Sequence, residues 1–144
     1  MTIHLPYLHL PHPDDLILGS VGPLPIQQFF LDRQSIYLMA ILAVFMAPIV
    51  EETVFRGFLY PVFARSLRVP GGIALTGILF GLMHAQQLWG GWAQIVLLVI
   101  VGVIFTTARA RTASVIPCYL LHLGYNAIQF LGFFFSDQFH KLPL

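Results

Sequence analysis

Four hydrophobic segments fill most of this 144-residue chain, and each is about as long as a membrane-spanning helix. They run approximately over residues 36–63, 72–88, 92–108 and 114–135. A spanning helix needs roughly 17–25 apolar residues, so the second and third segments are at the short end. Hydrophobic residues make up 58% of the chain and charged residues only 9%, which excludes an ordinary soluble domain. We therefore expect an all-α, polytopic helical membrane protein with a four-helix transmembrane core.

The chain is expected to form one domain with two polar extensions. Residues 1–34 are interrupted by several prolines, which favours an irregular or interfacial N-terminal arm. Residues 35–136 are the predicted membrane core, and residues 137–144 a polar tail. The formal net charge of +1 and the lack of a basic run argue against nucleic acid as a partner, so the lipid bilayer is the expected surrounding. The single cysteine, Cys118, is expected to be a packing residue.

The short connections predict antiparallel neighbouring helices and a cytoplasmic side. We expect a loop over residues 65–71, and a tilt or kink of the long first segment at Pro48 or Pro61. If that segment crosses once, two connections on one side carry four arginines and no acid, so this side is predicted to be cytoplasmic. We also expect the buried polar site to be reached from it. The arginines are Arg65, Arg68, Arg109 and Arg111.

A stripe of small residues marks the second segment, where Gly77, Gly81 and Ala85 recur at four-residue spacing. Such a stripe allows another helix to approach closely. His84 is three residues from Gly81 and is therefore expected beside this contact, pointing into the protein.

Six polar residues stand inside or beside the hydrophobic segments. Such residues are costly in lipid and usually face a protein interior or a wet cavity, which makes them candidates for a functional site. Counted along helices from the arginine side, four of them lie within about a turn and a half of one depth. The six are Glu51, Glu52, Arg56, His84, His122 and Asn126.

Helical spacing divides these residues by role. Glu52 and Arg56 are four apart and share a face, which favours a structural ion pair. Glu51 is rotated by about 100° from Glu52 and is left for chemistry as a general base. His122 and Asn126 are also four apart on one helix face.

Two chemistries fit this set. In the first, Glu51 with His84 activates a water molecule for attack on an amide, while His122 and Asn126 donate hydrogen bonds to the oxyanion, and no metal or other cofactor is needed. In the second, Glu51, His84 and His122 are the ligands of a catalytic zinc ion. The chain lacks the H-E-x-x-H spacing that would favour zinc.

The motifs E-E-x-x-x-R, F-x-x-x-H and H-x-x-x-N occur here in order, as Glu51-Glu52/Arg56, Phe80/His84 and His122/Asn126. In this the chain resembles the CPBP group of intramembrane proteases, which includes the type II CAAX prenyl endopeptidases and the bacterial Abi-type proteins. The likeness covers about residues 38–131.

The resemblance implies an endopeptidase in which the first glutamate activates water and the two histidines and the asparagine complete the site. In eukaryotic relatives the substrate is a prenylated protein that loses its three C-terminal residues. We accordingly expect a multi-pass protein of the bacterial plasma membrane, with a membrane-associated protein or peptide substrate, lipidated or not. Relatives commonly carry further helices before the core, so a homo-oligomer stays open. The alternatives are a non-catalytic immunity or scaffold protein with the same fold and a zinc-dependent form of the hydrolase.

Overall fold

The structure is a computed structural model that describes residues 33–136. These residues are helical apart from short turns and contain no strand, which confirms the all-α prediction for this part of the chain. Residues 1–32 of the predicted arm and the whole of the predicted polar tail, residues 137–144, lie outside this range. The elements in chain order are α1 (Arg33–Ile41), η3 (Leu42–Met46), α2 (Ala47–Glu52), η4 (Thr53–Leu59), α3 (Tyr60–Met83), α4 (Trp92–Thr112) and α5 (Ile116–Phe134).

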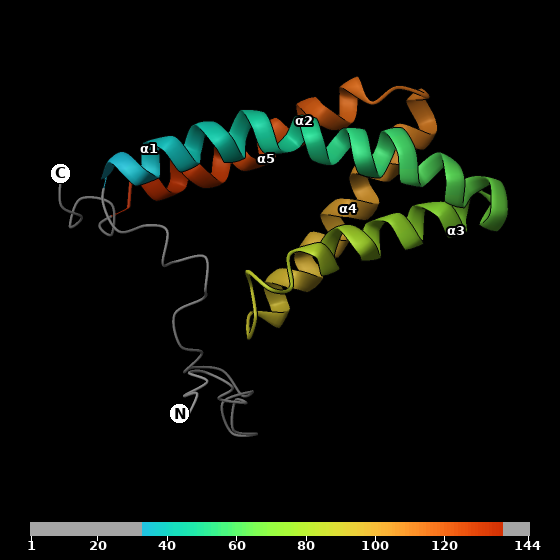
Figure 1. Ribbon diagram of the computed structural model, residues 1–144, viewed down its shortest axis with the longest axis horizontal. Helices are drawn as coiled ribbons and strands as arrows, with labels where there is room; N and C mark the ends of the chain where they lie inside the picture. Colours follow the sequence, from blue (N-terminus) through green and yellow to red (C-terminus); the bar gives the residue numbers. More distant parts are fainter. Residues whose placement is uncertain (1–32, 137–144) are drawn as a thin grey trace, which may run out of the picture.

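The chain reverses inside α3 without the loop that we expected over residues 65–71. Only Arg68 departs from helical geometry, with φ 62° and ψ 172°, and the two arms of α3 fold back on each other there (Figure 1). Gly72 makes this sharp reversal possible, because a Cβ at that position would lie 2.8 Å from the backbone nitrogen of Ala64. The prediction of a loop was wrong because a single strained residue beside a glycine contact is enough to turn the chain.

Both prolines that mark kink sites follow a π-helical turn. Pro48 comes after η3 and Pro61 after η4. A proline ring clashes with the carbonyl four residues before it and offers no N–H, so a wider turn just before the ring relieves the clash. Single π-helical turns are rare and frequently occur at functional sites. The dipeptide Glu51-Glu52 ends α2, between the two wide turns.

The second arm of α3 packs against α4 through the predicted glycine stripe. A Cβ on Gly77 would lie 2.9 Å from the backbone nitrogen of Val103, and one on Gly81 would lie 2.9 Å from that of Val99. The helix ends at Met83, before the predicted end of this segment at residue 88, so Ala85 contributes nothing to a helical seam.

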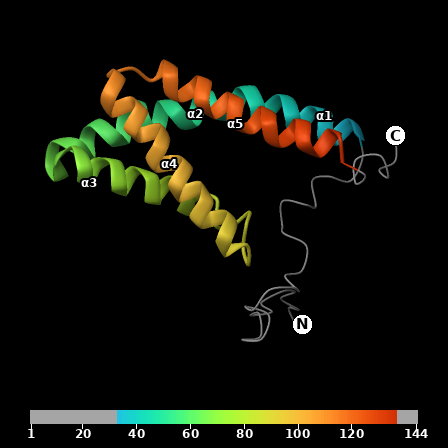
Figure 2. The same ribbon diagram turned by 180° about the vertical axis from the view of Figure 1, so that it is seen from behind.

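The helices form two diverging layers (Figures 1 and 2). In one layer α5 lies beside η3 and α2, and in the other the second arm of α3 lies beside α4. The outer surface carries many exposed apolar side chains, among them Phe58 and Ile128. Two stretches of the described residues are long and apolar enough to cross a membrane, Gln34–Met83 and Trp92–Thr112. The first of them contains the reversal at Arg68, and a core of four crossings stays a prediction.

Candidate active site

A cavity of about 830 Å³ lies between the two layers and brings four of the predicted residues together. Glu51 reaches it from the end of α2. His84, which caps the C-terminus of α3, reaches it from the end of that helix. His122 and Asn126 reach it from one face of α5. The shared depth inferred from helical counting therefore corresponds to a shared cavity wall.

The cavity extends away from the arginine side. Its lining includes Met39 in α1, Leu88 in the turn after α3 and Phe133 near the end of α5. None of the four arginines lines it. The expectation that the site is reached from the arginine-bearing end was therefore wrong, because the two layers meet at that end and diverge at the other (Figure 1).

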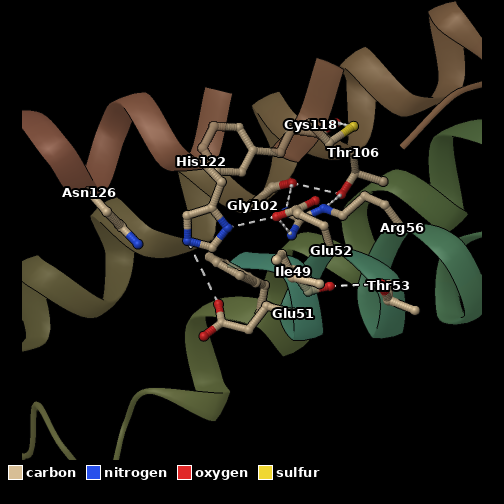
Figure 3. A network of polar contacts seen from close by, with 12 residues as sticks. Ile49, Glu51, Glu52, Thr53, Arg56, Gly102, Thr106, Cys118, His122 and Asn126 are labelled. Carbon is tan, nitrogen blue, oxygen red and sulfur yellow. Dashed lines mark hydrogen bonds and ion pairs between the residues drawn. The ribbon is translucent and has the colours of Figure 1, made fainter. Parts of the chain in front are cut away.

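Glu52 lies behind Glu51 and is the centre of a buried polar network (Figure 3). Its Oε1 accepts a hydrogen bond of 2.8 Å from Nη1 of Arg56. The same oxygen is 2.8 Å from Nδ1 of His122. Glu52 and Arg56 are 1% and 0% exposed, so this is a fully buried ion pair. Glu52 therefore binds Arg56, as helical spacing predicted, and also holds a histidine of the cavity wall.

The guanidinium of Arg56 is satisfied mainly by α4. Its Nη2 donates to the carbonyl oxygen of Gly102 at 3.0 Å, and its Nε donates to the hydroxyl of Thr106 at 3.2 Å. The ring of Phe80 lies 4.5 Å from the guanidinium carbon, within range of a cation–π contact. Sequence reasoning missed Gly102 and Thr106, although Thr106 is a polar residue in an apolar segment. The several partners explain how a charged side chain is tolerated at full burial.

The contact with Glu52 fixes how the ring of His122 is used. A carboxylate only accepts hydrogen bonds, so Nδ1 of His122 is the protonated nitrogen and donates the hydrogen bond to Glu52. Nε2 of His122 then faces Glu51, whose Oε2 is 3.8 Å away, beyond a direct hydrogen bond. In the neutral ring this nitrogen has a free lone pair, and in the imidazolium it becomes a donor.

His84 is oriented in the same way by its own helix. Its Nδ1 is 2.9 Å from the carbonyl oxygen of Phe80, which can only accept, so Nδ1 is again the protonated nitrogen. Nε2 of the neutral ring therefore keeps its lone pair. The ring of Phe80 packs against both histidines, with centroids 5.2 Å from His84 and 5.6 Å from His122.

Asn126 has a partner that the sequence did not indicate. Its Nδ2 donates a hydrogen bond of 2.8 Å to the carbonyl oxygen of Ala43 in η3. An amide nitrogen has two N–H groups, and this bond uses one of them. Asn126 lines the cavity as well, so it joins α5 to η3 at the edge of the site.

The two carboxylates each keep one buried oxygen without a hydrogen-bond partner, Oε2 of Glu51 and Oε2 of Glu52. Such an atom is costly unless a ligand or water completes it. Oε2 of Glu51 faces Nε2 of His122 at 3.8 Å, and the Glu51 side chain as a whole keeps 18% of its surface exposed in the cavity wall, so its carboxylate can be reached by water.

The arrangement does not match a zinc site. Within residues 33–136, no three side chains of His, Cys, Asp or Glu are grouped as the ligands of a metal ion would be. The Nδ1 atoms of both histidines are bonded to protein acceptors, which leaves only Nε2 of each ring for a metal ion, and within the described residues these atoms form no group of three ligands with Glu51. We therefore derive no step through a metal.

Comparison of the chain with protein-family profiles identifies its relatives. The profile of the Rce1-like family, type II CAAX prenyl endopeptidase Rce1-like, matches residues 33–128, two thirds of the chain. The chain belongs to this family. The profile match confirms the resemblance seen in the three motifs. The Rce1-like family consists of membrane-embedded peptidases. Comparisons with curated proteins and with solved structures gave no match.

Proposed function

We propose that this chain is an intramembrane endopeptidase in which Glu51 activates water for hydrolysis of a peptide bond. The observation that carries the proposal is the partly exposed carboxylate of Glu51 in the wall of a large cavity, 3.8 Å from Nε2 of His122. Membership of the Rce1-like family supports a peptidase.

The steps follow from the hydrogen-bond roles of the four residues. Glu51 takes a proton from water, and the hydroxide adds to the carbonyl carbon of the substrate. The second N–H of Asn126 and Nε2–H of protonated His122 donate to the resulting oxyanion. The carboxylate of Glu52 stabilises that imidazolium. The C–N bond then breaks, and Glu51 returns its proton to the leaving amine.

His84 has a supporting role beside Glu51. Because its Nδ1–H is bonded to the carbonyl of Phe80, its Nε2 can accept a hydrogen bond from the attacking water. The Phe80 carbonyl holds the ring in this orientation, so the histidine and the carboxylate share the task of placing the water.

The cavity and the outer surface support a substrate that lies in the membrane. Much of the cavity wall is aliphatic or aromatic, and the outer surface carries exposed apolar side chains, which suits a bilayer rather than water. We take the four helical arms as crossings of a bacterial plasma membrane, with the arginine side in the cytoplasm. The substrate class is a membrane-associated protein or peptide, with a prenylated C-terminus as the first candidate.

A cleavage assay tests the proposal. The purified protein in detergent micelles is given a farnesylated peptide with a CAAX terminus and the same peptide without the lipid, and products are identified by mass spectrometry. We expect Glu51→Gln to lower cleavage by about 10²- to 10⁴-fold, since it removes the base and keeps the size of the side chain. Thr53→Val is the matched control, because Thr53 is exposed and bonds only to Ile49 of its own helix.

Three outcomes contradict the proposal. Equal cleavage by wild type and Glu51→Gln removes Glu51 as the base. Stoichiometric zinc that is lost together with activity on chelation replaces the carboxylate mechanism by the metal one. If the wild type cleaves neither peptide, the candidate substrate class is wrong and the non-catalytic scaffold becomes the better interpretation.

A further inference from the structure

The two π-helical turns leave specific backbone carbonyls without a donor from their own helix. In η4, the N–H of Tyr60 bonds to the carbonyl of Phe55, five residues earlier. The next carbonyl, that of Arg56, would need the N–H of residue 61 in the same register. Residue 61 is proline and has none.

η3 repeats this arrangement one proline earlier. The N–H of Ala47 bonds to the carbonyl of Leu42, again five residues back. The following carbonyl, that of Ala43, faces Pro48 in the same register and has no backbone donor. An unpaired buried carbonyl is costly, so each of these two positions needs a donor from elsewhere.

A side chain from another helix supplies the donor in both cases. Nε of Arg109, in the last turn of α4, donates to the carbonyl of Arg56 at 3.1 Å. Nδ2 of Asn126, in α5, donates to the carbonyl of Ala43 at 2.8 Å. The guanidinium of Arg109 also lies 5.9 Å from the ring of Tyr60, at the edge of cation–π range.

The placement of these bonds bears on the site. Arg56 is bonded through its side chain to Glu52 and through its carbonyl to Arg109, so one residue joins the buried network to the last turn of α4. Glu52 in turn holds Nδ1 of His122. A continuous chain of hydrogen bonds therefore runs from Arg109 through Arg56 and Glu52 to the ring of His122.

We propose that Arg109 is a positioning residue. It donates the hydrogen bond that Pro61 cannot give to the carbonyl of Arg56, and thereby holds Arg56, Glu52 and His122 in position. Arg109 thus has a different task from the exposed Arg111 two residues later, although both were assigned from sequence to the cytoplasmic side. The catalytic meaning of this bond rests on the proposed function, whereas the bond itself is measured without activity.

The test is a double-mutant cycle read on His122. Protein labelled with ¹⁵N-histidine in detergent micelles gives the Nδ1 and Nε2 signals of His122, assigned with His122→Gln. We expect Arg109→Met to shift these signals, Arg109→Lys to shift them at least twofold less, and the control Arg111→Met to leave them unchanged. Pro61→Ala restores a backbone N–H, so in that background Arg109→Met should cause at most half of its original shift.

Each possible result either supports or overturns the positioning role of Arg109. Equal shifts with and without the Pro61→Ala substitution, or no shift for Arg109→Met, overturn the proposal. If Arg109→Met does not fold, judged by its helical circular dichroism, folding of the Pro61→Ala/Arg109→Met protein counts as the same rescue, and its failure to fold overturns the proposal. In the cleavage assay, Arg109→Met should lower kcat with little change in KM, and Pro61→Ala should lessen the loss. A cycle that holds while no protein cleaves the peptide contradicts the proposed function and leaves the positioning role intact.

Discussion

Glu52 shows at the level of one residue how a buried charge serves both structure and site. Its Oε1 accepts from Arg56 and from His122, so the carboxylate that helical spacing assigns to an ion pair also sets the tautomer of a cavity residue. The adjacent Glu51 lines the cavity, and its Oε2 has no hydrogen-bond partner. A rotation of about 100° between neighbours on a helix is the physical reason that two consecutive glutamates perform different tasks.

Removing the positive charge from this network should strongly destabilise the protein. Arg56→Met leaves Glu52 buried without its cationic partner and should lower the free energy of unfolding by about 3–5 kcal/mol. Replacing both partners, with Glu52→Gln added to Arg56→Met, removes the uncompensated charge and should recover part of that loss. Thermal unfolding in detergent micelles measures both. A double variant less stable than Arg56→Met would contradict the buried pair as described.

At Arg68, by contrast, a substitution should stabilise the protein. The residue's φ of 62° and ψ of 172° belong to a region that glycine adopts readily and other residues avoid, at a cost of about 1–3 kcal/mol. Arg68→Gly should therefore stabilise the protein, by about 1 kcal/mol once the greater freedom of glycine in the unfolded chain is counted. Arg65→Gly, at a helical position in the first arm of α3, is the control and should destabilise. A lower melting temperature for Arg68→Gly contradicts the strained reversal.

The seam between α3 and α4 is the clearest feature at the level of elements. Gly81 approaches Ile95 and Val99 of α4 so closely that an added Cβ would lie about 3 Å from backbone atoms, where it has no room to move. The sequence predicted a close helix contact from the stripe of small residues. Only the packing showed that the partner is α4 and that the stripe ends at Gly81.

A matched pair of glycine substitutions tests that seam. Gly81→Ala should destabilise by about 1–3 kcal/mol, because the methyl group forces the two helices apart. Gly132→Ala is the control, since a Cβ there meets nothing within 4 Å, and alanine in α5 should stabilise by roughly 0.5–1 kcal/mol. Thermal unfolding of both proteins gives the comparison. Equal effects of the two substitutions would contradict a close α3–α4 contact.

The prolines of the long helix also act at the level of elements. The sequence marks Pro48 and Pro61 as kink sites, but it does not show that each is absorbed by a π-helical turn. Nor does it show that the released carbonyls are closed by Asn126 and Arg109 from distant helices. These bonds join residues 83 and 53 positions apart, so no local pattern contains them.

At the scale of the whole molecule, the two layers meet at the arginine-bearing turns and diverge toward the start of α1 and the turn after α3 (Figures 1 and 2). The cavity lies in the diverging part. The sequence predicts that the arginine end lies in the cytoplasm, and the wide end of the cavity would then face the opposite side of the bilayer. This combination of charge and shape can be tested directly.

Cysteine labelling in intact cells tests the orientation. In a Cys118→Ala background, a cysteine at Arg111 should be protected from a membrane-impermeant maleimide, whereas one at Trp89 should react. Both positions are exposed, so a difference in labelling reports the side of the membrane. Labelling of Arg111→Cys in intact cells, or protection of Trp89→Cys, reverses the predicted topology.

Sequence by itself determined the helical class, the polar residues that meet at one cavity and the family, because burying charge in apolar helices is costly and helical spacing limits which residues share a face. Tertiary structure decided the remainder: the reversal at Arg68, the second partner of Glu52, the direction of the cavity and the donors for the two released carbonyls. Each of these depends on contacts between helices distant in the chain or on a single strained residue. A local pattern fixes which side chains are compatible with a helix, and only packing determines which of them touch.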